Sequence, residues 1–203
     1  LDIGRSALKS VISDMTGEVI YKHSEETGQS LPPEGLIKRI GQMTISTIAA
    51  SNVPKEKLLG IGVGMPGLID ASTGHVIFSP DFHWKNVSLR EELQTMLTYR
   101  VMVENSNLSL ARGEHSYGSG VGADFIVCIS VGHGIGAGII FDGKPYYGRS
   151  GTSGEIGHVT MEPNGPVCLC GNHGCLEALA SGAAVARSAY NILQQGVPTL
   201  MRD

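Results

Sequence analysis

The chain has 203 residues, of which 41% are hydrophobic, and a formal net charge of −4 at pH 7. This length and composition predict a globular α/β protein with one large or two small cores. The weak negative charge gives no electrostatic reason to expect this segment to bind nucleic acid. Since there is neither an apolar run long enough to cross a membrane nor a signal-peptide pattern, we expect no membrane partner. The chain opens without Met, directly on a motif, and we expect it to be a piece of a longer protein.

The first fifty residues predict a strand hairpin followed by a long helix. Residues 1–6 indicate a strand end and a turn, residues 7–13 a second strand, and residues 18–22 a third. Apolar residues at helical spacing then predict a helix over residues 32–51. Its core-facing stripe consists of Leu36, Ile37, Ile40, Met43 and Ile48.

Two further strands end in turns that could meet a ligand. Residues 58–64 indicate a buried strand that ends in a sharp turn at Gly67, and residues 101–104 indicate a strand that leads into Asn105. In α/β sheets, ligands lie beyond the carboxyl ends of the strands. Gly67 is therefore a candidate for close backbone approach to a ligand, and Asn105 would reach the same cleft.

The only tryptophan lies between these two strands. An aromatic ring with polar neighbours suits a carbohydrate face, but we favour Trp84 as a packing anchor. Asp81, in the same loop, is a minor candidate for ligand contact. Ser88 and Glu91 have the spacing of a capping box before a helix.

The second half predicts a hairpin and a helix on either side of a cysteine-rich loop. Residues 124–131 favour a strand that holds Cys128 as a core thiol, and a hairpin turns at residues 142–143. A helix is predicted over residues 183–195. A glycine-rich hinge near residues 116–122 would divide the chain into an N-terminal lobe (1–117) and a partial C-terminal lobe (118–203).

Three of the four cysteines lie in that loop, together with a well-placed histidine, His158. Zinc prefers thiolate and imidazole ligands, and four such groups close a structural tetrahedral site, which here would consist of His158, Cys168, Cys170 and Cys175. A redox pair would normally space its cysteines by two residues, which disfavours a redox function here. We therefore favour a zinc site, and the alternative is three buried thiols in a glycine-rich loop that bind no metal. Reduced thiols also point to the cytoplasm.

Two carboxylates flank the predicted metal site. Glu155 precedes His158 by three residues and Glu177 follows Cys175 by two, so a bound ion would hold both near the same imidazole. A zinc-bound histidine keeps its other ring N–H for a hydrogen-bond partner, which here could be a ligand hydroxyl.

The stretch from His158 to Glu177, with CLCGNHGCLE at residues 168–177, resembles the signature of the ROK family, which groups bacterial repressors with sugar kinases. GEIGH at residues 154–158 resembles the family's sugar-site motif, and the resemblance covers essentially the whole chain. It implies an actin-like ATPase (ribonuclease-H-like) α/β fold of two lobes, with the second lobe incomplete in this chain. It further implies a homo-oligomer, a dimer or tetramer, and sugar contacts from Gly67, Asn105, Glu155, His158 and Glu177.

Three positions depart from the pattern of the family's kinases. In those kinases, Asp-x-Gly at the first hairpin approaches the nucleotide phosphates and usually continues Gly-Thr, whereas Arg5 and Ser6 follow here. Their Asn-Asp-Ala turn carries the Asp that takes the proton from the attacking hydroxyl. Here Ser106 stands at that base position, and a serine hydroxyl does not accept a proton at neutral pH. His133 replaces a small hydroxyl residue of the second phosphate loop, and its bulk disfavours a nucleotide.

The sequence therefore predicts the sugar-sensing effector domain of a ROK-type transcriptional regulator, stabilised by zinc and without a catalytic residue. A hexose in the interlobe cleft would modulate DNA binding by a helix-turn-helix that is absent from this chain, so DNA would be a partner only through that domain. The alternative is a glucokinase-like sugar kinase that uses ATP and Mg²⁺. A third interpretation is a zinc-stabilised interaction domain that binds no sugar.

Overall fold

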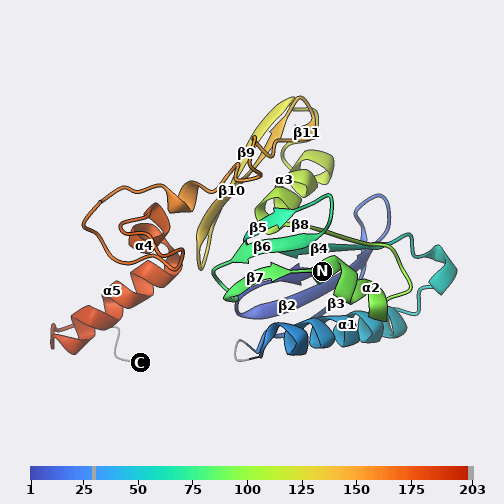
Figure 1. The fold of residues 1–203 in the computed structure, drawn as a ribbon, viewed down its shortest axis with the longest axis horizontal. Coiled ribbons are helices and arrows are strands. Elements are labelled where there is room, and N and C mark those ends of the chain that lie inside the picture. Colours follow the sequence, from blue (N-terminus) through green and yellow to red (C-terminus); the bar gives the residue numbers. More distant parts are fainter. Residues whose placement is uncertain (29–30, 201–203) are drawn as a thin grey trace.

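The computed structural model describes residues 1–28 and 31–200 and is built around a mixed β-sheet (Figure 1). The sheet has the strand order β3-β2-β1-β4-β8, with β1 (Asp2–Ile3), β2 (Ala7–Ser13), β3 (Val19–Glu26), β4 (Ile61–Met65) and β8 (Val101–Asn105). β1, β2 and β3 pair antiparallel, as the hairpin pattern predicts, whereas β1, β4 and β8 run parallel. β4 begins later than predicted, because Lys55–Lys57 form a 3-10 turn whose last hydrogen bond holds Leu58.

Two helices, α1 (Pro33–Ala50) and α2 (Leu89–Met96), enclose the main core with this sheet (Figure 1). The apolar stripe of α1 is confirmed at four of its five positions, which are buried, and Ile48 is half-buried. Trp84 is 1% exposed in the same core, and its ring packs on Phe82 with a centroid separation of 5.7 Å. The packing-anchor interpretation of Trp84 is therefore confirmed.

A second, antiparallel sheet of β5 (Leu68–Asp70), β6 (His75–Ser79) and β7 (Trp84–Val87) was not predicted. It carries the loop that contains Asp81. The capping box at α2 is wrong: the Ser88 side chain makes no cap hydrogen bond, and its hydroxyl lies 3.4 Å from the Nδ1 atom of His75 on β6. The Ser88 hydroxyl therefore contacts a histidine on another element instead of capping α2, as the local sequence pattern predicted.

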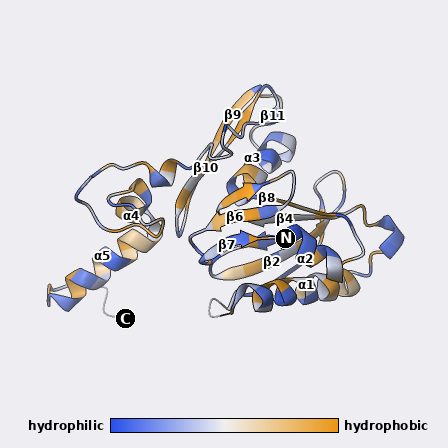
Figure 2. Cartoon of the chain, in the orientation of Figure 1, coloured by the Kyte–Doolittle hydropathy of each residue, from blue (hydrophilic) through white to orange (hydrophobic). Residues whose placement is uncertain are grey.

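Helix α3 (Ser106–Tyr117) leads from β8 to a third sheet of β9 (Phe125–Val131), β10 (Ile135–Phe141) and β11 (Lys144–Pro145). The lobe boundary predicted near residues 116–122 falls in the turn after α3 and stays a prediction. β9 is an edge strand whose apolar side chains on one face are exposed. Figure 2 shows the hydrophobic colour along this strand. Cys128, on the other face of β9, is half-buried, so the prediction of a core thiol is wrong.

The last two helices of the described chain, α4 (Leu176–Ala180) and α5 (Gly182–Gln194), lie apart from the main sheet (Figure 1). The predicted C-terminal helix is confirmed. Its apolar residues are largely exposed, with Val185 at 62% and Ile192 at 42%. No helix in the described ranges has the length and hydropathy to cross a membrane.

Candidate functional site

The four predicted metal ligands lie together in the structure. One ligand atom from each of His158, Cys168, Cys170 and Cys175 lies within 4.8 Å of all the others. Nδ1 of His158 is 3.6 Å from Sγ of Cys168, and Sγ of Cys170 is 3.8 Å from Sγ of Cys175. In a tetrahedral zinc site, bond lengths of about 2.3 Å to sulfur and about 2.1 Å to nitrogen place ligand atoms about 3.8 Å apart for two sulfurs and about 3.6 Å for sulfur and nitrogen. These two separations match a tetrahedral site, and the cluster could hold a metal ion.

Tight backbone turns bring these ligands together. The N–H of Cys168 donates to the carbonyl of Asn172 at 2.8 Å, and the N–H of Gly171 donates to the carbonyl of Cys168 at 2.9 Å. Gly174 has a φ of 60°, and a side chain there would collide with the carbonyl of Glu162. Glycine is required at this position because only it tolerates both the positive φ and the close approach.

Burial disfavours the thiolate form of two of the cysteines. It raises the pKa of Cys168 to about 12 and shifts the pKa of Cys175 in the same direction. Because metals bind the thiolate, an incoming ion has to displace these protons. The residues present could hold a metal ion, and bound zinc would supply structural cross-linking of the loop.

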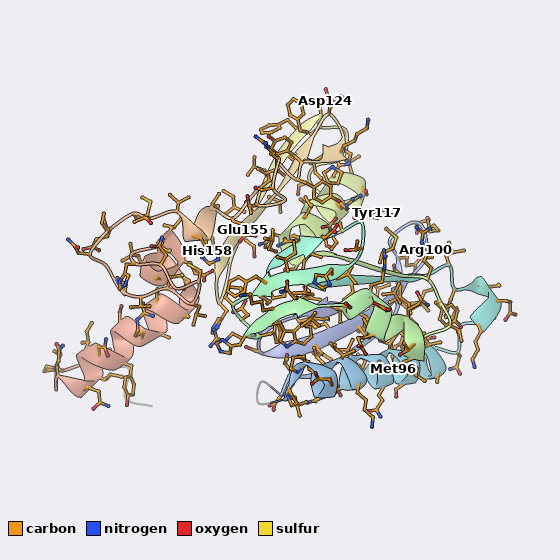
Figure 3. All side chains as sticks on the ribbon, in the orientation of Figure 1. Met96, Arg100, Tyr117, Asp124, Glu155 and His158 are labelled. Carbon is orange, nitrogen blue, oxygen red and sulfur yellow. The ribbon has the colours of Figure 1, made fainter. Side chains whose placement is uncertain are left out.

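The imidazole of His158 lies between the other candidate metal ligands and Glu155. A 3-10 turn, Ile156–His158, orients the ring so that Nδ1 faces Cys168 while Nε2 lies 3.7 Å from Oε2 of Glu155. Figure 3 shows Glu155 and His158 beside β10, between the sheets and the C-terminal helices. Burial raises the pKa of Glu155; His158 opposes this shift and Glu177 adds to it.

Asn105 connects the end of β8 to Glu155. Its Oδ1 caps α3 by accepting from the N–H groups of Asn107 at 2.8 Å and Leu108 at 3.2 Å. Its Nδ2 donates to the carbonyl of Gly67 at 2.9 Å and lies 3.5 Å from Oε1 of Glu155. One amide therefore caps a helix and joins two parts of the site that are fifty residues apart in sequence.

All five predicted sugar-contact residues line one cavity of about 400 Å³, namely Gly67, Asn105, Glu155, His158 and Glu177. Oε2 of Glu177, in the first turn of α4, accepts from the N–H of Ile135 at 2.8 Å. Asp81, the minor candidate, also lines this cavity. The cavity thus has the Asn105 amide at the end of β8 on one side, and Glu155, His158 and Glu177 on the other.

Sequence reasoning missed the apolar part of this cavity. Phe78, Pro80 and Leu169 also line it. Leu169 stands between the predicted metal ligands Cys168 and Cys170, so its position in the sequence could have indicated that it lies near the cavity. Phe78 could not be identified from the sequence, because it lies on β6, in the sheet that was not predicted.

A larger cavity of about 1700 Å³ adjoins the smaller one, and Ser106, Asn107 and Ser130 line both. None of the five predicted sugar-contact residues lines the larger cavity. Glu104 lines this larger cavity, whereas its neighbour Asn105 lines the smaller one. This matches the alternation of side chains along a strand.

The three departures from the kinase pattern have defined surroundings. Ser106 opens α3 and lines the smaller cavity together with His133. Nη1 of Arg5 lies 3.5 Å from Oδ1 of Asp81, so the first hairpin is ion-paired to the loop after β6. The N–H of Gly4 donates to the carbonyl of Ala7 at 3.0 Å, within the hairpin itself.

Gly67 gives a direct test of the backbone at the cavity. It has a φ of 120°, and an added Cβ would collide with the carbonyl of Phe78. We expect Gly67→Ala to lower the free energy of unfolding by about 1–3 kcal/mol, as measured by urea denaturation. Gly62→Ala is the matched control, because a Cβ at Gly62 meets no atom within 4 Å. Equal losses in the two variants would contradict this account.

Comparisons with known proteins agree on the family. A family model described as "ROK family" matches residues 1–199. The glucokinase of Thermotoga maritima is 37% identical over 188 residues, which are 92% of this chain and 58% of the relative. The xylose repressor of Caldicellulosiruptor bescii is 33% identical over 197 residues, which are 97% of this chain and 49% of the relative. This chain thus spans about half to three-fifths of these relatives.

Solved structures give the same result. A ROK family glucokinase from Streptomyces griseus, in complex with glucose and AMPPNP, superposes with a TM-score of 0.83 at 31% identity and covers 96% of this chain and 60% of its own. A ROK family transcriptional regulator, a homologue of the E. coli MLC protein, gives a TM-score of 0.80 at 30% identity and covers 98% and 50%. The chain belongs to the ROK family and has the predicted actin-like ATPase fold. Kinases and repressors match it at similar identity.

Proposed function

We propose that this chain is the sugar-sensing part of a ROK-type transcriptional regulator and that it binds a hexose in the 400 Å³ cavity. Ser106 at the base position is the observation that carries this proposal. The nearest carboxylate in sequence, Glu104, is engaged elsewhere: its Oε1 accepts from the N–H of Asn105 at 3.0 Å and its Oε2 from the hydroxyl of Tyr147 at 2.6 Å. Phosphoryl transfer depends on positioned groups, so neither residue suits the role of base.

The cavity residues have the chemistry to recognise hydroxyl groups. Glu155 and Glu177 offer carboxylate acceptors, and the Nε2–H of His158 is a donor when Nδ1 binds the metal. The Asn105 amide adds a donor at the end of β8. Groups at fixed spacing discriminate between sugars because a wrong epimer leaves one of them unpaired.

Zinc would support this arrangement from the C-terminal side. His158 is both a predicted ligand and a cavity residue, and Glu177 follows the ligand Cys175 by two positions. When bound at the four ligands, zinc would fix the loop that carries these side chains. The sugar would therefore meet a pre-ordered wall rather than a mobile loop.

Ligand binding would be transmitted by a shift between two arrangements of the chain. Asn105 ends β8 of the central sheet and Gly67 lies in the turn that follows β4, whereas Glu155, His158 and Glu177 belong to the C-terminal segment. A hexose that contacts both groups favours the arrangement in which they lie closest. In the whole regulator this shift would change how a helix-turn-helix, located outside this chain, meets DNA.

A second candidate function is an ATP- and Mg²⁺-dependent hexose kinase. It is favoured by the similarity to glucokinases and by the glycine-rich stretch at residues 132–138, which forms the turn before β10 and the start of that strand. Against it stand Ser106, the Arg5–Asp81 ion pair at the first hairpin, and the bulk of His133.

Calorimetry separates these functions. We expect the full-length protein, with bound zinc established by elemental analysis, to bind at least one sugar in a panel of neutral and N-acetylated hexoses, equally well with and without Mg²⁺–ATP. A coupled assay should detect no sugar-dependent ADP formation. Robust turnover would overturn the sensor proposal in favour of the kinase. Zinc at one per chain without binding of any hexose would favour an interaction domain.

A further inference from the structure

Three polar side chains form a network on the side of β8 away from the proposed sugar cavity. The hydroxyl of Tyr147 donates to Oε2 of Glu104 at 2.6 Å, and Nη2 of Arg112 donates to the Tyr147 hydroxyl at 3.1 Å. Arg112 also lies 3.7 Å from Oε2 of Glu104. All three residues line the larger cavity, and the Glu104 side chain is only 16% exposed.

The hydrogen bonds of this network have a fixed direction. Burial raises the pKa of the Tyr147 hydroxyl, and the bond to Glu104 raises it further while Arg112 opposes the shift. The hydroxyl therefore stays protonated at neutral pH, accepting from Arg112 and donating to Glu104. A bond to a carboxylate is charge-assisted and stronger than one between neutral groups.

Glu104 connects this network to the cavity on the other side of the strand. Its second oxygen accepts from the backbone N–H of Asn105 at 3.0 Å. The side chain of Asn105 in turn donates to the carbonyl of Gly67 at 2.9 Å and lies 3.5 Å from Glu155. A continuous series of contacts thus runs from Tyr147 through Glu104 to Asn105.

The same network ties the two walls of the proposed site together. Glu104 and Arg112 belong to β8 and α3, whereas Tyr147 lies after β11 on the segment that leads to Glu155. The segment is therefore held to β8 twice, by Tyr147 on one face and by Glu155 near Asn105 on the other.

We propose that Tyr147 is a positioning residue for the hexose site, which it orders by fixing Glu104 and through it Asn105. This role rests on the proposed function, since it assumes that a hexose occupies the smaller cavity. Tyr147 does not line that cavity. Its effect on binding would therefore come from the arrangement of the two walls.

The test is Tyr147→Phe in the full-length, zinc-loaded protein, with the hexose that the wild type binds best as the probe. We expect the affinity to fall about three- to tenfold, the size of a contribution from a network that does not touch the ligand. Tyr146→Phe is the matched control, because among the described residues no hydrogen bond involves its hydroxyl, and its ring packs on Phe141 with a centroid separation of 6.4 Å. This control should bind like the wild type.

A spectroscopic readout separates positioning from general stability. With Asn-selective ¹⁵N labelling, the backbone amide resonance of Asn105 should shift in Tyr147→Phe and not in Tyr146→Phe, while zinc content stays at one per chain. Glu104→Gln provides a second variant. If the two residues act through one series of contacts, the double variant loses little more affinity than either single variant.

The outcomes are distinguishable. A wild type that binds a hexose, together with a Tyr147→Phe variant of equal affinity and an unchanged Asn105 resonance, would overturn the positioning role and leave the proposed function intact. Additive losses in the double variant would also count against it. A wild type that binds no hexose would overturn the proposed function itself.

Discussion

Cys175→Ser is expected to abolish stoichiometric zinc binding and to lower the free energy of unfolding by about 4 kcal/mol, as elemental analysis and urea denaturation would measure. Cys175 is fully buried, and among the described residues the apolar cluster around it consists of Cys168, Ala178 and the half-buried Cys170. So small a core cannot hold the loop by apolar burial alone. A site whose metal is present at a thousand times its dissociation constant contributes about 4 kcal/mol, which the variant would forfeit.

Loss of zinc should also disturb the proposed sugar cavity, because His158 and Glu177 line it. Glu177 begins α4 two residues after Cys175, and His158 would lose the ion that orients its ring. We therefore expect calorimetry to show no hexose binding by the zinc-free variant.

Cys128→Ser is the matched control for this experiment. Cys128 is half-buried in β9 and does not belong to the four-ligand cluster. This control should keep one zinc per chain and bind hexose like the wild type. If Cys175→Ser also keeps its zinc, or unfolds like the control, the cluster is not the structural centre of this loop.

The parts of the structure that follow from local spacing could be predicted from the sequence. The four ligands lie within residues 158–175, so their spacing alone indicated one site, and the atoms converge as expected. The stripe of α1 is likewise a local pattern, and its first four positions are buried. In both cases the partners are close in the chain, and little tertiary information is needed.

Features set by distant partners could not be predicted in this way. Nothing near Ser88 indicates that His75 lies beside its hydroxyl. Exposure along β9 and α5 depends on what packs against them, and a single sequence gives no account of that. The meeting of Asn105 with Glu155 was expected only from the family resemblance, because no local pattern joins residues fifty positions apart.

Asn105→Asp is expected to lower hexose affinity by at least about a hundredfold, or about 3 kcal/mol, while leaving the fold intact. An aspartate keeps the acceptor that caps α3, since Asp and Asn are about equally good N-caps. It loses both donors of Nδ2, however, and places a negative charge beside Glu155. The carboxylates of residue 105 and Glu155 would then repel each other, and the cavity would lack its hydrogen-bond donor at the end of β8.

Asn105→Ala separates the two roles of this amide. It removes the cap as well as the donors, so its free energy of unfolding should fall by about 1–2 kcal/mol more than that of Asn105→Asp, which keeps the cap. Both variants should fail equally in calorimetry against the hexose that binds the wild type. If Asn105→Asp binds normally, the contacts of Nδ2 serve only to hold Gly67 in place, and recognition must come from the carboxylates and the imidazole on the opposite wall.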